Sequence, residues 1–310
     1  MHYRPLGATG ATVSEVSMGC NRLGEGDQPD SHWIALVRRA ADLGVNLFDT
    51  SESYGWGRSE EMLGQALGNR ANVLIATKMS RVRDSDAKDF SAARMIHTVE
   101  QSLRRLRREC IDVYQLHSPG RADLERFDWA EGMARLAEQG KIRWRAVAVY
   151  SAADGVWLIQ QGLVDVLQVT YNLFDTTAEA ELFPLAQERG VGILCRLPLA
   201  QGILTGKFRA GDAVPAGHRA HLAGSQMADR IAKAEVLRPL AAHYPGGMAR
   251  LAHHFSLTPP AVSAIIPGAR TIAQVEENVA ASNATGLSAT VRAQVDAIRA
   301  TWTTDPPINQ

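Results

Sequence analysis

"VNLFDTSESYGWGRSEEMLGQALG" (residues 45–68) contains the two patterns on which the fold prediction rests. It begins with an apolar run, residues 45–48, that ends at Asp49. Such near-continuous runs are typical of strands buried on both faces of a parallel sheet. A helical pattern follows, for which Ser59 is the expected N-cap, with acidic residues in the first turn. The stretch therefore predicts one β-strand followed by one α-helix.

The same alternation recurs along the chain. Apolar runs cover residues 16–20, 45–50, 73–78, 111–117, 146–151, 166–172, 192–198 and 261–267. Helical patterns cover residues 31–44, 59–68, 91–110, 122–140, 178–190 and 271–283. This order predicts an α/β protein, a single (β/α)8 TIM barrel domain over residues 1–310. A doubly wound sheet is the alternative, but the chain has no GxGxxG turn, which that fold usually carries.

Three segments add to the barrel. Residues 3–17 contain a glycine turn between two short segments and predict an N-terminal β-hairpin. Residues 200–260 are too long for one helix and a loop, so we expect an insertion between the last two strands. Residues 288–302 predict an extra C-terminal helix.

Composition narrows the class of protein. Of the 310 residues, 45% are apolar and 21% charged, and Lys+Arg and Asp+Glu both number 33. The formal net charge is therefore zero, and the protein has no overall electrostatic field that would favour nucleic acid or a membrane surface as a partner. The three cysteines, Cys20, Cys110 and Cys195, lie far apart, which argues against disulfides and zinc and favours a reducing compartment. The N-terminus lacks a signal-peptide pattern, and no run reaches the roughly 18 apolar residues of a membrane helix. We expect a cytoplasmic monomer or small homo-oligomer.

Polar side chains follow three neighbouring strands of the predicted barrel. The second run ends at Asp49 with Tyr54 just beyond it, the third ends at Lys78, and the fourth ends at His117. Barrel enzymes carry their working residues at the C-terminal ends of strands, so we expect the four side chains to meet. Taken one at a time, each residue has an ordinary structural explanation. Asp49 would cap a turn, and Tyr54 would pack as a loop aromatic. Lys78 would be a solvated residue at a strand end, and His117 would be a hydrogen-bonded polar residue. Together they favour a catalytic site.

These four residue types make a proton-donating site. A tyrosine hydroxyl, with a reference pKa of about 10, is a poor acid at neutral pH. A lysine ammonium beside it is expected to lower that pKa, and Asp49 supplies the lysine's counter-charge. His117 is expected to orient a substrate oxygen. These four residues include a proton donor for a carbonyl oxygen. They include no nucleophile and no set of metal ligands.

The pattern resembles the aldo-keto reductases, NAD(P)H-dependent carbonyl reductases built on this barrel. The segments that carry the resemblance are "NLFDTSESYGWGRSEEMLGQAL", "IATK", "IDVYQLHSP", "QVTYNLFD", "RLPLAQGILTGKF" and "IIPGARTIAQVEENV", in the family's order over nearly the whole chain. The resemblance implies that Tyr54 is the general acid, that Lys78 and Asp49 tune it, and that His117 orients the substrate.

The cofactor segments lie after the last strands. The Gly-rich loop that contains Thr205 and Lys207 can wrap a pyrophosphate, and the helix start near Arg270 favours a phosphate. Arg270 suits a 2′-phosphate, which favours NADPH over NADH, although a solvated loop charge is the ordinary alternative. With the resemblance, the expected cofactor contacts are Gly19, Cys20, Asn21, Asp49, Gln168, Arg196, Leu197, Leu199, Gly202, Leu204, Thr205, Lys207, Ile266, Gly268, Arg270, Gln274, Glu277 and Asn278.

Some positions depart from the family pattern. The family usually follows its fifth strand with GVSN, whose Ser and Asn hold the nicotinamide carboxamide. Here those positions are Ala148 and Val149, so Gln168 would hold the carboxamide nearly alone unless a shifted alignment brings Ser151 into play. Weak anchoring of the nicotinamide end is the expected consequence. Arg196 stands where a ring often stacks on the nicotinamide, and its planar guanidinium can also stack.

The expected substrate contacts are Asn21, Tyr54, Trp56 and His117. Asn21 replaces a family tryptophan and makes the pocket more polar, which hints at sugar-like substrates. Trp56 is expected to form a pocket wall, with a loop-anchoring role as the alternative. We therefore expect an NADPH-dependent, metal-independent reductase of aldehydes or ketones, or the reverse reaction on a sugar-like alcohol. A cofactor-binding regulatory subunit with slow turnover is the second reading, and a metal-dependent sugar isomerase is the third.

Overall fold

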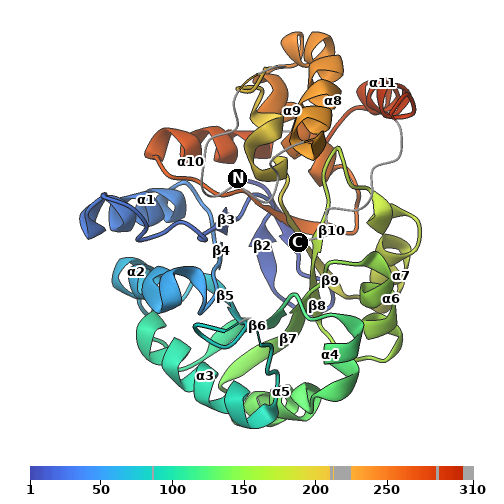
Figure 1. The fold of residues 1–310 in the computed structure, drawn as a ribbon. Helices are drawn as coiled ribbons and strands as arrows, with labels where there is room; N and C mark the ends of the chain where they lie inside the picture. Colours follow the sequence, from blue (N-terminus) through green and yellow to red (C-terminus); the bar gives the residue numbers. More distant parts are fainter. Residues whose placement is uncertain (86, 210–211, 213–224, 284–285, 303–310) are drawn as a thin grey trace.

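The computed structural model describes residues 1–85, 87–209, 212, 225–283 and 286–302. Eight parallel strands pair in chain order, and helices surround them (Figure 1). The strands are β3 (Met18–Gly19), β4 (Leu47–Asp49), β5 (Leu74–Met79), β6 (Ile111–His117), β7 (Ile142–Ala148), β8 (Val166–Thr170), β9 (Gly192–Arg196) and β10 (Val262–Ile266). The backbone N–H groups of Ser17 and Gly19 donate to the carbonyls of Ile265 and Pro267, which brings β3 beside β10. The predicted barrel is confirmed.

The helices include those predicted between the strands and those predicted in the added segments. They are α1 (Asp30–Asp42), α2 (Arg58–Leu67), α3 (Ala92–Leu106), α4 (Arg121–Arg126), α5 (Trp129–Glu138), α6 (Ala152–Gln160), α7 (Leu182–Arg189), α8 (Ser225–Ala242), α9 (Gly247–Leu257), α10 (Ile272–Val279) and α11 (Ala289–Arg299). Short 3-10 turns are η1 (Tyr54–Gly57), η2 (Thr177–Glu179), η3 (Ala200–Thr205) and η5 (Ala280–Asn283). The expected insertion contains η3, α8 and α9, and the expected C-terminal helix is α11.

Apolar side chains fill two regions. The larger core lies between the outer face of the barrel and the helices. The smaller core lies inside the barrel and draws side chains from seven of its strands: Leu47, Ala76, Val113, Ala146, Val166, Leu194, and Ala264 with Ile266. Because these residues fill the barrel, it is a packed core rather than a pore.

The predicted hairpin closes one end of the barrel. Its strands, β1 (Tyr3–Pro5) and β2 (Thr12–Ser14), pair antiparallel, and Leu6 and Val13 join the inner core. The turn lies against the start of β9, where the Ala8 N–H donates to the Gly190 carbonyl at 2.7 Å. Gly7 has φ of 56°, and a Cβ there would lie 2.4 Å from the Gly190 oxygen. The hairpin therefore covers the N-terminal ends of the strands and leaves the C-terminal ends for a site.

Two element boundaries differ from the sequence prediction. The fifth strand begins at Ile142 rather than at residue 146, because Arg143 and Arg145 interrupt its apolar pattern. Arg145 nevertheless belongs to the strand, where its side chain pairs with Asp165 at 2.9 Å. The pattern over residues 122–140 is two helices, α4 and α5, separated by the extended backbone of Phe127.

The start of α2 and the helix after β7 also differ from the prediction. Ser59 is not the N-cap, because Gly57 takes that position in the left-handed region. The Ser59 hydroxyl instead donates to the Cys20 carbonyl at 2.7 Å. The prediction had no helix for α6, whose apolar residues are consecutive and show no helical period. Among the described residues, no helix has the length and apolar character needed to cross a lipid bilayer.

Candidate active site

Three neighbouring strands bring the four predicted catalytic side chains to one end of the barrel. Asp49 ends β4, Lys78 lies near the end of β5 and His117 ends β6. Tyr54 begins η1, in the loop between β4 and α2. The loop then runs through three left-handed residues, Gly55 to Gly57, before α2 starts. The two glycines allow this turn, since a Cβ on Gly55 would lie 2.8 Å from Arg58.

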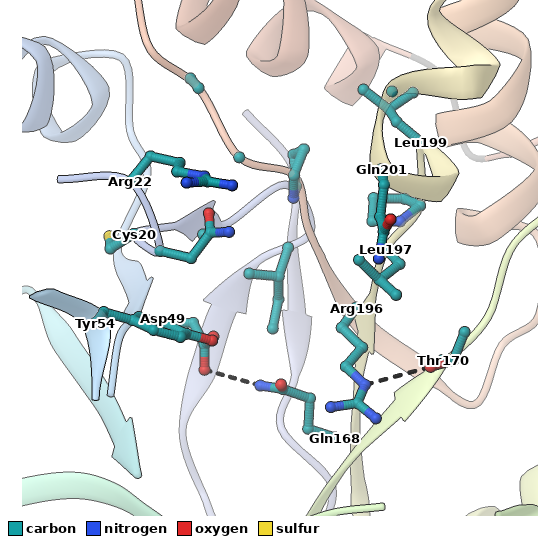
Figure 2. Close-up of a pocket in the computed structure, with 18 of the residues that line it drawn as sticks. Cys20, Arg22, Asp49, Tyr54, Gln168, Thr170, Arg196, Leu197, Leu199 and Gln201 are labelled. Atoms are coloured by element: carbon teal, nitrogen blue, oxygen red, sulfur yellow. Dashed lines mark hydrogen bonds between the residues drawn. The ribbon is translucent and has the colours of Figure 1, made fainter. Parts of the chain in front are cut away.

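A buried ion pair forms the base of the site. The Lys78 ammonium donates to an Asp49 carboxylate oxygen at 2.6 Å and to the Thr50 carbonyl at 2.7 Å. The other Asp49 oxygen accepts from the side-chain amides of Gln115 at 3.1 Å and Gln168 at 2.8 Å (Figure 2). Burial lowers the pKa of Lys78. With these partners both charges are satisfied, which a buried pair needs to be tolerated.

Tyr54 lies above this pair. The Lys78 ammonium nitrogen is 5.4 Å from the centre of the Tyr54 ring. Burial raises the pKa of Tyr54, and the negative charge of Asp49 raises it further. The pKa of Tyr54 is thus raised overall rather than lowered, because desolvation of the phenolate outweighs the nearby positive charge of Arg196. Tyr54 holds its proton at neutral pH.

His117 faces Tyr54. The two ring centres are 5.6 Å apart, and the rings are nearly perpendicular. His117 Nδ1 is 3.1 Å from the Ser51 hydroxyl, so Nε2 is the ring nitrogen left for a ligand. Burial lowers the pKa of His117 well below its ordinary value, and Lys78 and Arg196 lower it further. His117 is therefore neutral at pH 7, able to form a hydrogen bond without carrying charge.

Arg196, at the end of β9, is held by three neutral acceptors. Its guanidinium donates to the Thr170 hydroxyl at 3.3 Å, the Ser118 hydroxyl at 3.0 Å and the Val149 carbonyl at 3.0 Å. The Tyr150 ring lies 5.0 Å from the guanidinium carbon. Figure 2 shows the guanidinium beside Gln168, across the cavity from Asp49 and Tyr54.

The positions that depart from the family's GVSN pattern do not reach the cavity. The side chains of Ala148 and Val149 are buried, and neither lines the cavity. Ser151 caps α6, where its hydroxyl accepts from the Asp154 N–H at 3.4 Å, and it does not line the cavity either. Gln168 and Tyr150 line this wall instead.

One elongated cavity of about 930 Å³ links the catalytic residues to the start of α10. Most of the predicted cofactor residues line it: Gly19, Cys20, Asn21, Asp49, Gln168, Arg196, Leu197, Leu199, Gly202, Thr205, Lys207, Ile266, Gly268, Arg270 and Gln274. Leu204, Glu277 and Asn278 do not; Leu204 is buried, and the Asn278 amide donates to the Gly268 carbonyl at 3.3 Å. Trp56, the expected pocket wall, does not line the cavity; its ring lies 5.7 Å from the Arg83 guanidinium carbon.

The structure adds residues that the sequence reasoning missed. Arg22, Ser118, Tyr150, Thr170 and Gln201 also line the cavity. Ser118, Tyr150 and Thr170 lie at or just after the ends of β6, β7 and β8, so a search of every strand end would have included them. No sequence signal distinguishes Arg22 or Gln201.

The family model for the aldo/keto reductases matches residues 15–300. This chain belongs to the aldo/keto reductase family. It is 32% identical to an NADH-specific methylglyoxal reductase of Escherichia coli over 90% of this chain and 93% of that protein. It is 31% identical to a probable voltage-gated potassium channel subunit beta of rice over 91% of each chain. The solved glycerol dehydrogenase of Gluconobacter oxydans superposes with a TM-score of 0.84 at 27% identity, over 98% of this chain and 97% of that one.

The cavity residues fit the nicotinamide dinucleotide that this reductase family implies. Four basic side chains line the cavity, Arg22, Arg196, Lys207 and Arg270, of which Arg22 is paired with Glu25. Among the described residues of the wall the one acid is Asp49, which is paired with Lys78. The loop after β9 is tightly curved, since Leu197, Ala200 and Gln201 all have positive φ. Such strained backbone clusters at ligand sites. Among the described residues, no group of three or more histidine, cysteine, aspartate or glutamate side chains is arranged to hold a metal ion.

Proposed function

We propose that this chain is an NADPH-dependent reductase of aldehydes or ketones in which Tyr54 donates the proton. The observation that supports this most directly is the meeting of Tyr54, His117 and the Lys78–Asp49 pair at one end of an elongated cavity. When bound, the reduced nicotinamide supplies the hydride. Tyr54 protonates the carbonyl oxygen, and His117 Nε2 holds that oxygen in place.

The protonation state of Tyr54 suits a proton donor. Burial raises the pKa of Tyr54, so its hydroxyl is protonated at neutral pH, although the same shift makes it a weaker acid than a free tyrosine. The Lys78 ammonium, 5.4 Å from the centre of the Tyr54 ring, would offset part of this cost by stabilising the phenolate that forms when the proton moves. We therefore infer that Lys78 acts on the deprotonated form of Tyr54.

The preference for NADPH rests on Arg270. Its guanidinium lines the cavity near the start of α10 and forms no hydrogen bond or ion pair with the part of the chain that the structure describes. Its backbone N–H donates to the Gln274 side chain at 2.8 Å, and Thr271 caps the helix, so the loop is held in place. A free guanidinium there suits a 2′-phosphate. Because the Escherichia coli relative is named as NADH-specific, the affinities for both cofactors should be measured.

The test is consumption of NADPH with a panel of small aldehydes and ketones, methylglyoxal among them. Tyr54→Phe is expected to lower kcat/KM by about three orders of magnitude, as loss of a general acid does, while the Kd for NADPH stays unchanged. Tyr3→Phe, in an exposed tyrosine whose hydroxyl donates to the Gly44 carbonyl, is the control and should retain full activity. Unchanged turnover in Tyr54→Phe would contradict the mechanism.

A cofactor-binding regulatory subunit is the second candidate. Two observations favour it: the channel-subunit name of the rice relative, and the absence of side-chain hydrogen bonds at Ala148 and Val149. Such a protein would bind NADPH and turn over slowly with every carbonyl compound in the panel. A wild-type kcat in the range of ordinary enzymes, roughly 1 per second or more, would exclude this reading.

A further inference from the structure

The segment that follows β9 forms one wall of the cavity, and its backbone is strained. We call residues 197–207 the cofactor segment; its cavity-lining members are Leu197, Pro198, Leu199, Gln201, Gly202, Thr205 and Lys207. Figure 2 shows its labelled residues across the cavity from Tyr54. Leu197, Ala200 and Gln201 have φ of 58°, 43° and 57°, in the left-handed region that non-glycine residues rarely adopt. Such a conformation persists only where the surrounding structure holds it in place.

Asn172 holds the start of the cofactor segment. It follows β8, is fully buried, and donates from Nδ2 to the Leu197 carbonyl at 3.0 Å. That carbonyl also accepts from the Ala200 N–H at 2.9 Å, which closes the turn at the start of the segment. The Asn172 Oδ1 accepts from the N–H groups of Phe174 at 2.9 Å and Asp175 at 3.2 Å. One side chain therefore joins the loop after β8 to the carbonyl at which the left-handed backbone begins.

The helix α11 holds the loop that contains Asn172. The Arg299 guanidinium donates to the Leu173 carbonyl at 2.9 Å and to the Thr176 hydroxyl at 2.6 Å, both in the loop after β8. Its guanidinium carbon lies 5.5 Å from the centre of the Phe255 ring, in α9. Two successive sets of hydrogen bonds thus connect α11 to the wall of the cavity.

We propose that Asn172 and Arg299 are positioning residues for the cofactor segment, so that α11 sets the affinity for the nicotinamide dinucleotide. The inference rests on the proposed function in one respect, which is that this cavity binds that cofactor. Neither residue lines the cavity, so both act through the segment. They keep it in the strained conformation that binds. When only a fraction of the molecules has that conformation, the apparent Kd rises by the inverse of the fraction.

The alternative is a purely structural role, in which the same contacts stabilise the fold and leave the cavity unaffected. Arg292 provides the comparison, since it belongs to the same helix and lies 4.8 Å from the centre of the same Phe255 ring. Its guanidinium bonds to Glu179 and Asp296, whereas that of Arg299 bonds to the loop after β8. Removing either arginine weakens the attachment of α11, but only Arg299 holds that loop.

The experiment measures the Kd for NADPH and for NADH by isothermal titration calorimetry, together with the free energy of unfolding in urea. Arg299→Met, which keeps an unbranched side chain against Phe255, is expected to raise both Kd values by about 5- to 10-fold, the size of one net hydrogen bond. Asn172→Ser should raise them by about tenfold or more, since serine still accepts from a turn N–H but is too short to reach the Leu197 carbonyl. Arg292→Met is the control and should leave both Kd values within about twofold of wild type, whatever its effect on unfolding.

Hydrogen exchange of the backbone amides, followed by mass spectrometry, locates the effect. Residues 197–207 should exchange faster in Arg299→Met and Asn172→Ser than in wild type, because the segment opens more often. In Arg292→Met these amides should exchange as in wild type. Kd values and exchange that match wild type in both test variants would overturn the inference. An equal rise in Kd for Arg299→Met and Arg292→Met would also overturn it, because the effect would then come from a general loss of stability.

The outcome also distinguishes the two proposals. If wild type binds NADPH and all three variants bind it equally well, the proposed function stands and the positioning role does not. If wild type binds neither dinucleotide, the proposed function fails, and hydrogen exchange of residues 197–207 decides the positioning role alone. Exchange equal to that of wild type in both test variants then overturns it. Arg299→Met serves as the test variant if Asn172→Ser does not fold.

Discussion

The hydroxyl of Ser51 contacts two strands of the site at once. It lies 3.1 Å from His117 Nδ1, at the end of β6, and 3.3 Å from the Lys78 carbonyl of β5. A hydroxyl that bonds one ring nitrogen sets the tautomer and orientation of the other nitrogen. Ser51 is therefore a positioning residue for His117 Nε2, which we place on the carbonyl oxygen of the substrate.

Ser51→Ala is expected to lower kcat/KM by about 5- to 10-fold, the value of one net hydrogen bond, and to leave the Kd for NADPH unchanged. Ser51→Thr keeps the hydroxyl and should recover most of the activity. Ser53→Ala is the matched control, since the Ser53 hydroxyl contacts Ser51 but not His117. Steady-state kinetics with one good aldehyde measures all three. A fall in Ser53→Ala equal to that in Ser51→Ala would show that the loop, not His117, is affected.

At the scale of elements, α2 packs closely on the end of α3 at Gly64. A Cβ there would lie 2.2 Å from the Arg105 carbonyl oxygen and 3.0 Å from the carbonyl carbon of Leu106. Both are backbone atoms, which cannot move aside as the end of a flexible side chain does. The contact sets how closely α2 packs on α3, and α2 directly follows the Tyr54 loop.

Gly64→Ala is expected to lower the free energy of unfolding by about 1–3 kcal/mol, because overpacking outweighs the gain of about 1 kcal/mol in helix propensity. Urea denaturation of both proteins measures the difference. Gly120→Ala is the matched control: it precedes α4, and its Cβ would lie an ordinary 3.7 Å from the nearest atom, an Asp123 oxygen. An unfolding free energy for Gly64→Ala equal to or above that of wild type would contradict the close contact.

For the whole molecule, buried histidines couple stability to pH. His253, in α9, is 1% exposed, and its Nε2 has no hydrogen-bond partner in the described part of the chain. Burial lowers the pKa of His253 to about 3, and the neighbouring His254 and Arg250 lower it further. A lowered pKa means that the unfolded chain binds a proton before the folded one does. Neutral His253 therefore makes its full contribution to the free energy of unfolding above the unfolded-state pKa of about 6.5. This contribution is lost progressively as the pH falls below that value.

Lowering the pH from about 8 to about 5 should cost roughly 2 kcal/mol of unfolding free energy through His253 alone. His253→Leu should reduce the pH dependence by about that amount, whatever its effect at pH 8. His97, exposed on α3, provides the control: His97→Leu should leave the pH dependence as it is in wild type. Urea denaturation of the three proteins at both pH values measures these slopes. An identical slope in His253→Leu would refute the assignment.

The sequence by itself determined the fold class and the catalytic candidates. Eight apolar runs alternate with helical patterns, and parallel strands place their C-terminal ends on one rim, so Asp49, Lys78 and His117 could be grouped without a structure. The periodicity of a strand is local, as is the position of its last residue. The predicted start of the fifth strand was wrong for the same reason, because Arg143 and Arg145 interrupt its local apolar pattern.

Only the tertiary structure decided what surrounds each group. The pKa of Tyr54 is raised mainly by burial, which depends on the folded structure and cannot be seen in the sequence around Tyr54. The partners of Arg196 come from β6, β7 and β8, and none is near it in sequence. Desolvation and hydrogen bonding depend on distances in space rather than along the chain. For this reason the grouping of the three strand-end residues, Asp49, Lys78 and His117, was predictable, whereas the hydrogen-bond partners of Arg196 were not.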